Sequence, residues 1–70
     1  MFIVVEMQTS GSSTAIVTPV EYTDRNEAEA KYHTVLAAAA VSDVEKHACI
    51  VFTEEGFPIM HDCYRHNTTP

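Results

Sequence analysis

The stretch of residues 24–41 constrains the fold most, because its composition and spacing predict one amphipathic helix. Asp24 is a good N-cap, and Glu27 three residues later can complete a capping box. The interior is mostly Ala, Glu, Lys and Leu, which are strong helix formers. At 100° per residue, one stripe gathers the residues expected in the core: Ala28, Tyr32, Val35, Leu36 and Ala39. A second stripe carries smaller side chains: Ala30, Thr34, Ala37 and Val41.

The rest of the chain predicts strands around this helix. Four segments are rich in β-branched and aromatic residues or alternate in polarity: 2–8, 14–22, 46–53 and 57–65. Ser and Gly at 9–13 predict a hairpin tip, and 54–56 predict a tight turn with Gly56 at positive φ. Pro19 cannot donate to a ladder, so the second strand should lie at an edge or carry a bulge.

This order, ββαββ, predicts an α+β fold built as a two-layer sandwich. Short, uncrossed connections favour a four-stranded antiparallel sheet in the order second, first, third, fourth, with one helix on one face. Residues 1–65 form the single predicted domain, and residues 66–70 a polar C-terminal tail.

Two segments carry a family resemblance. Residues 26–42 (NEAEAKYHTVLAAAAVS) and residues 47–59 (HACIVFTEEGFPI) resemble a family of small uncharacterised proteins of gut bacteria and their phages. The resemblance carries over no catalytic residue, because no established activity accompanies it. It implies an accessory gene product in the cytoplasm of a bacterium or of a phage-infected host.

Length and charge limit the function classes. A chain of 70 residues buries only about 60% of its unfolded surface, and such chains often gain stability by oligomerisation. A net charge of −6 argues against a nucleic-acid binder, which needs a positive surface. The first apolar run ends at Glu6, too short for a signal peptide or a membrane span. We therefore expect a cytoplasmic protein without nucleic-acid or membrane partners and without a cofactor.

The sharpest chemical pattern is a pair of His-x-Cys motifs, formed by His47 and Cys49 and by His61 and Cys63. If the turn sets Thr53 opposite Phe57, all four side chains share one sheet face, and two Cys with two His are a zinc ligand set. Neighbours on a strand are nearer 7 Å apart, however, and a slip of one residue would destroy the square. We therefore expect reduced thiols and ordinary imidazoles, with zinc as the rival. Thiol catalysis lacks an orienting third group, so no catalytic residue is predicted.

The two faces of the predicted sheet indicate self-association. One helix can cover only one face, but neither face of the 46–65 hairpin is polar, so an apolar face would remain exposed. The candidate interface residues for a homo-oligomer are Ala30, Thr34, Ala37, Val41, Val51, Phe57 and Ile59. A small, nucleotide-like ligand would have these cations available: Arg25, Lys31, His33 and Arg65. The acidic start of the helix disfavours phosphate there.

Two non-enzymatic functions follow from these patterns. The first is a binding module, phage-encoded in the setting that the resemblance implies, which sequesters a small molecule or blocks a host protein. The alternative is a structural or assembly subunit without a ligand, and a zinc-binding hairpin protein comes third.

Overall fold

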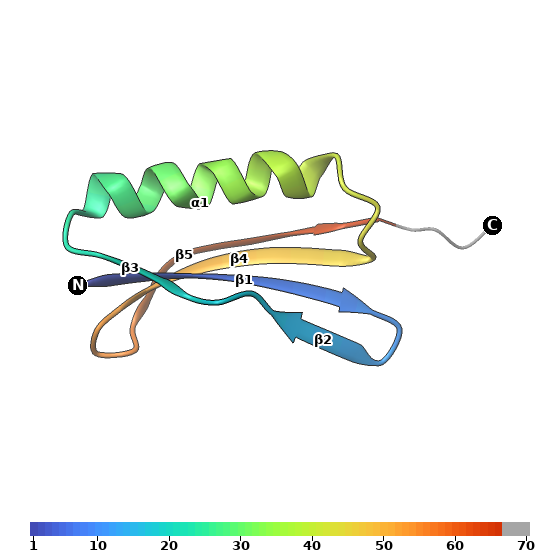
Figure 1. Cartoon of the computed structure of the whole chain (residues 1–70), viewed down its shortest axis with the longest axis horizontal. Coiled ribbons are helices and arrows are strands. Elements are labelled where there is room, and N and C mark those ends of the chain that lie inside the picture. Colours follow the sequence, from blue (N-terminus) through green and yellow to red (C-terminus); the bar gives the residue numbers. More distant parts are fainter. Residues whose placement is uncertain (67–70) are drawn as a thin grey trace.

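The computed structural model describes residues 1–66, in which one helix lies across one face of an antiparallel sheet (Figure 1). The prediction of an α+β chain with a single helix and an antiparallel sheet is confirmed for these residues. The helix α1 spans Arg25–Ala40. The strands in chain order are β1 (Phe2–Ser10), β2 (Ser13–Ile16), β3 (Val20–Tyr22), β4 (Lys46–Thr53) and β5 (Pro58–Arg65).

The number and order of the strands differ from the prediction. The predicted second strand is two short strands, β2 and β3, separated by residues 17–19. Both pair with β1 on the edge away from β4, so the order is β2-β1-β4-β5 with β3 also beside β1. Pro19 explains the break, because it has no N–H to donate to the ladder. The Val17 amide still donates to the Glu6 carbonyl at 2.9 Å, and the ladder is interrupted directly after it.

The helix follows its predicted boundaries and orientation. Asp24 is the N-cap, and its Oδ1 accepts a hydrogen bond from the Asn26 amide at 3.0 Å. Most of the predicted core stripe is buried, and Leu36 packs against the core. The predicted outer stripe is largely exposed, and Val41 retains 87% of its accessible surface.

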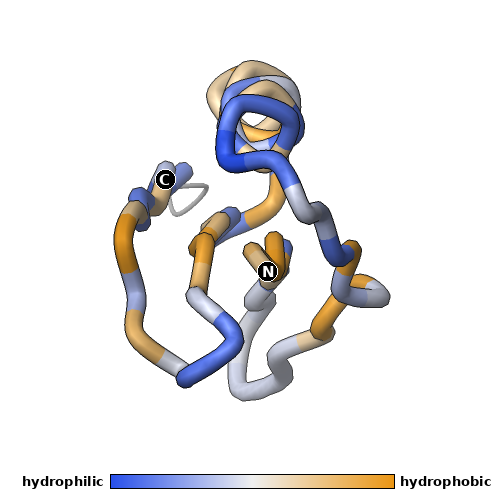
Figure 2. Tube along the Cα trace, turned by 90° about the vertical axis from the view of Figure 1, so that its left-hand side faces the viewer, coloured by the Kyte–Doolittle hydropathy of each residue, from blue (hydrophilic) through white to orange (hydrophobic). Residues whose placement is uncertain are grey.

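The core lies between α1 and the central strands β1 and β4. Val4, Cys49 and Val51 from the sheet meet three helix residues in one buried cluster: Ala28, Tyr32 and Val35. Burying an aliphatic side chain of this size stabilises the fold by about 1.5–3 kcal/mol. Seen end-on, α1 lies over one side of a curved sheet, and no described segment covers the other side (Figure 2).

A β-bulge sets the register between β4 and β5. The predicted turn is present, since Thr53 and Phe57 face each other through the Thr53 N–H and the Phe57 carbonyl at 2.8 Å. Phe52 then pairs with Pro58, but Val51 pairs with Met60, so β5 contains one extra residue, Ile59. Pro58 lacks the N–H that a regular ladder would use, which suits this position to a bulge. Every β5 residue beyond the bulge therefore faces the side opposite to the one predicted.

Candidate functional site

The face of the sheet opposite α1 is not covered by any described segment, and we call it the open face (Figure 2). It consists of alternate residues on five strands: Ile3, Val5, Met7 and Thr9 of β1, Thr14 and Ile16 of β2, Glu21 of β3, Lys46, Ala48, Ile50 and Phe52 of β4, and His61, Cys63 and Arg65 of β5. None of these residues is buried. The cross-strand pairs between β1 and β4 change along this face from apolar to polar. Ile3 with Phe52 is at the apolar end, and Thr9 with Lys46 is at the polar end.

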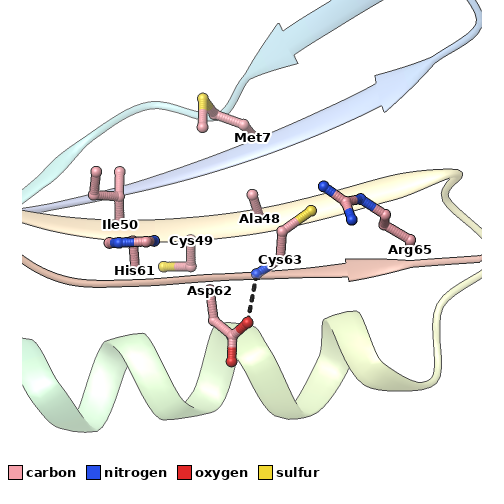
Figure 3. Close-up of a pocket in the computed structure, with 8 residues that line it drawn as sticks. All are labelled: Met7, Ala48, Cys49, Ile50, His61, Asp62, Cys63 and Arg65. Carbon is pink, nitrogen blue, oxygen red and sulfur yellow. Dashed lines mark hydrogen bonds between the residues drawn. The ribbon is translucent and has the colours of Figure 1, made fainter.

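A pocket of about 430 Å³ lies on this face beside β5. Its lining residues are Met7, Ala48, Cys49, Ile50, His61, Asp62, Cys63 and Arg65. Met7, Ala48 and Ile50 give it an apolar floor, while the imidazole, thiol and guanidinium of β5 give it polar groups (Figure 3). The Asp62 carboxylate points to the helix side of the sheet, where it accepts a hydrogen bond from the Cys63 amide at 2.8 Å. The other polar side chains that line the pocket, those of His61, Cys63 and Arg65, are all able to donate hydrogen bonds.

Two cations lie side by side at one end of the open face, and one of them, Arg65, lines this pocket. Lys46 pairs directly with Arg65 across β4 and β5, so two of the four Lys and Arg residues lie side by side in a chain of net charge −6. Like charges in directly opposed positions destabilise a sheet. Among residues 1–66, neither Lys46 nor Arg65 forms an ion pair. Glu45, beside Lys46 in the chain, accepts a hydrogen bond from the Gly11 amide at 2.8 Å instead.

The helix-covered face has a polar cluster of its own, at the C-terminal end of α1. The Glu6 Oε2 atom lies 2.5 Å from His47 Nε2, and His47 Nδ1 lies 3.0 Å from Ser42 Oγ. Gln8 Nε2 donates to the same Glu6 oxygen at 3.0 Å. Burial raises the pKa of Glu6, but hydrogen bonds from His47 and Gln8 and the positive charges of His47 and Lys31 together lower it below the ordinary value.

This Ser–His–Glu chain has the residue types of a hydrolase triad, but its geometry favours a structural role. Only 4% of His47 is exposed, and Ser42 Oγ also lies 3.1 Å from the Ala39 carbonyl. The nucleophile position would thus sit at the negative end of the helix dipole, which does not favour an oxyanion. His66 Nε2 donates to the same Ala39 carbonyl at 2.7 Å, so the cluster caps the helix and ties it to the sheet.

The His/Cys square required by the rival zinc site does not form in the structure. Because of the bulge, Cys49 pairs with Asp62 and Ala48 with Cys63, so His47 and Cys49 face the helix while His61 and Cys63 face the other side. Within residues 1–66, no group of three or more His, Cys, Asp or Glu side chains is placed to hold a metal ion. The two thiols also differ, since burial is the main cause that raises the pKa of Cys49 to about 11, whereas Cys63 is exposed.

The four predicted ligand-binding cations do not converge. Arg25 begins α1 and pairs with Glu29 at 3.0 Å, whereas Arg65 ends β5 at the opposite end of the molecule (Figure 1). The positive charge of Lys31 helps to lower the pKa of the Glu6 carboxylate. The His33 ring is exposed and contacts the Tyr32 ring edge-on, with 5.3 Å between the ring centroids. Of the four, only Arg65 lines the pocket. Ligand binding by the other three stays a prediction.

The predicted interface residues are scattered over three surfaces. Ala30, Thr34, Ala37 and Val41 lie on the outer side of α1, and Phe57 lies in the β4–β5 turn, all exposed. Val51 and Ile59 are corrections: Val51 is wholly buried beneath the helix, and Ile59 packs against the core. The bulge does not cause this difference, because Val51 and Ile59 share one face as the predicted register requires, and α1 covers that face.

Two parts of the site were missed from the sequence. No sequence pattern singles out Lys46 as a site residue, although its alternation with Ala48 and Ile50 places it on their face. Its pairing with Arg65 depends on the bulge, which no local pattern specifies apart from Pro58. The link between Glu6 and His47 joins residues 41 positions apart, and only the β1–β4 register reveals it.

Comparisons with protein families, curated proteins and solved structures find no match to this chain. In the described part of the chain, the helix is neither long enough nor apolar enough to cross a membrane. The predicted tail begins at His66, which is held at the helix end, and its residues 67–70 lie outside the described residues.

Proposed function

We propose that this protein is a small non-enzymatic binding module that works as a homodimer, with the open faces of two copies packed against each other. One observation carries the proposal: three successive cross-strand pairs on the open face are apolar and uncovered. These pairs are Ile3 with Phe52, Val5 with Ile50, and Met7 with Ala48. Antiparallel sheets with one solvated face normally alternate apolar and polar residues, and this face does not do so at its centre.

The size of the face suits a second copy of the chain. Four strand positions spaced about 4.8 Å apart and about eight residues rising about 3.3 Å each give a projected area of about 500 Å². A standard interface buries about 800 Å² of accessible surface on each partner, and pleated sheets expose more than their projected area. A two-fold axis would place the same apolar strip on both sides, in the manner of a sheet-on-sheet sandwich.

The alternative contact, through the outer stripe of α1, has weaker support. Its Ala30 and Ala37 side chains are single methyl groups that bury little area, and exposed alanines are ordinary on a solvated helix. The open face presents larger apolar side chains, and Ile16 at its margin is 63% exposed. Burial of this strip would also stabilise a chain that is marginal alone.

A binding role fits the rest of the geometry better than catalysis does. The one Ser–His–carboxylate arrangement among residues 1–66 is largely buried, and its polar atoms are bonded to one another. The pocket beside β5 opens on the surface instead. In the setting that the family resemblance implies, such a module would sequester a small molecule or block a host protein. A structural subunit without a ligand would share the dimer but not the binding.

Light scattering of the wild type and two matched variants tests the dimer. At micromolar concentration we expect a mass of twice 7.8 kDa for the wild type. Val5→Lys places a charge in the middle of the open face and should give a monomer with an unchanged circular dichroism spectrum. Ala37→Lys adds the same charge on the outer side of α1 and should remain a dimer. A wild-type monomer would overturn the proposal, and so would a monomeric Ala37→Lys beside a dimeric Val5→Lys.

A further inference from the structure

We infer that the pocket beside β5 binds a small organic anion with an apolar body, held by its charged group at Lys46 and Arg65. The inference rests on the binding role proposed above and names the class of ligand. One chain supplies every residue that lines the pocket, and Lys46 lies beside its lining residue Arg65. Met7, Ala48 and Ile50 of the floor also belong to the strip that the proposed dimer would bury, so the anion and a second copy would compete for them.

The charge arrangement is the first step. Lys46 and Arg65 face each other across two strands on the open face, and the described residues supply no ion-pair partner for either. The cost of opposing two cations disappears when an anion bridges them, because the directly opposed side chains are only about 5 Å apart at Cβ. A guanidinium can also bind a carboxylate or phosphate through two parallel hydrogen bonds.

The apolar floor is the second step, because it distinguishes an organic anion from a free inorganic one. Met7, Ala48 and Ile50 point to the same side of the sheet as Arg65, and the floor extends from the cationic end toward His61 (Figure 3). His61 and Arg65 are four residues apart on β5, or about 13 Å. A linear body of about eight carbon atoms would fit along this floor. The volume of about 430 Å³ lies in the usual range of small-molecule pockets.

The orientation of Asp62 is the third step. A carboxylate inside the pocket would repel an anion, but the Asp62 side chain turns to the helix side and accepts the Cys63 amide. The open side therefore presents His61, Cys63 and Arg65, all of them hydrogen-bond donors. In a chain with ten acidic residues, a pocket with no carboxylate turned toward its open side is a selective feature (Figure 3).

Titration with octanoate, followed by NMR of the Ala48 and Ile50 methyl groups, tests the inference. We expect saturable binding with a Kd of about 1 mM, which is typical of a ligand of ten heavy atoms. Arg65→Gln and Lys46→Gln should each weaken binding about tenfold, the usual effect of losing one charge-assisted hydrogen bond. Arg25→Gln removes the same charge at the far end of the molecule and should leave the Kd unchanged.

Two further probes separate the contribution of the ligand's charge from that of its hydrophobic body. Octylammonium has the same body with the opposite charge and should bind at least about tenfold more weakly than octanoate. Inorganic phosphate alone should shift neither methyl signal, because it lacks the body. Equal binding of octanoate and octylammonium, or an unchanged Kd in Arg65→Gln, would overturn the inference, as would no binding of octanoate up to about 10 mM. The floor residues also lie in the proposed dimer contact, so the titration is repeated at protein concentrations where light scattering reports a monomer. The dimer and the anion site can then fail separately.

Discussion

The two faces of the sheet handle their charged residues in opposite ways. On the helix-covered face, Glu6 and His47 are paired at 2.5 Å and bonded onward to Gln8 and Ser42. On the open face, Lys46 and Arg65 lie opposite each other with no partner among residues 1–66. Paired charges of the first kind hold a fold together, since each polar group is satisfied within the chain. Unpaired like charges of the second kind cost stability, and they make sense when something outside the chain neutralises them.

The apolar residues of the two faces also differ, in how far they are buried within one chain. Val51 and its neighbours on the covered face meet α1 and are buried, whereas Ile50 on the same strand lies on the open face and is only partly buried. In the proposed dimer, adjacent positions of β4 would therefore serve folding and association separately. The predictions below exchange or remove residues at matched positions on the two faces, from the largest expected effect to the smallest.

The largest contrast is between Val51→Asp and Ile50→Asp. Val51 is fully buried, so a carboxylate there would be desolvated without a partner and should cost ~4 kcal/mol or more, enough to unfold a small domain. Ile50→Asp places the same group on the open face, where water can reach it, and should leave a folded chain. Urea unfolding followed by circular dichroism measures both. Similar loss of structure in the two variants would mean that the open face is itself a core.

The next contrast concerns Glu6 and the pH dependence of stability. The pKa of Glu6 in the folded chain is depressed, so its contribution to stability is present above the unfolded pKa and is lost as the pH falls through the folded value. Thermal melts from pH 7 down through pH 4 and below should therefore show less acid destabilisation in Glu6→Gln than in the wild type.

Arg65→Gln, which removes an unpaired cation, should change the free energy of unfolding at pH 7 by only about 0.5 kcal/mol or less.

Glu29→Gln is the matched control for this pH effect. Glu29 pairs with Arg25 on the helix surface, where an ion pair contributes little. If Glu29→Gln flattened the acid limb as much as Glu6→Gln does, the special role of the buried pair would be wrong.

The smallest expected effect is the difference in thiol reactivity between the two cysteines. Cys49 is 1% exposed, and burial raises its pKa to about 11, so little thiolate is available at neutral pH. Cys63 is exposed on the open face. A thiol reagent such as Ellman's should modify one thiol per folded chain at pH 8 and two in denaturant. Cys63→Ser should abolish the fast reaction in the folded protein, and fast modification of that variant would show that Cys49 is accessible.

The sequence predicted what depends on local chemistry. The helix, its Asp24 cap and its buried stripe follow from periodicity and composition, and the sheet strands follow from β-branched runs. The sequence failed where one residue changes long-range register. Pro58 signals an irregular strand start, but only the structure shows that the bulge absorbs Ile59 and reverses the facing of β5. The register required by the rival zinc square was wrong for that reason, and the Lys46–Arg65 pair depends on the same bulge.

The most direct test of the central claim, that the open face is the contact between copies, is isotope-filtered NMR on a mixed sample of labelled and unlabelled chains. The account predicts intermolecular nuclear Overhauser effects among the side chains of Ile3, Val5 and Phe52. The contrary result would be intermolecular contacts confined to Ala30 and Ala37 on the outer side of α1, or none at concentrations where light scattering reports a dimer.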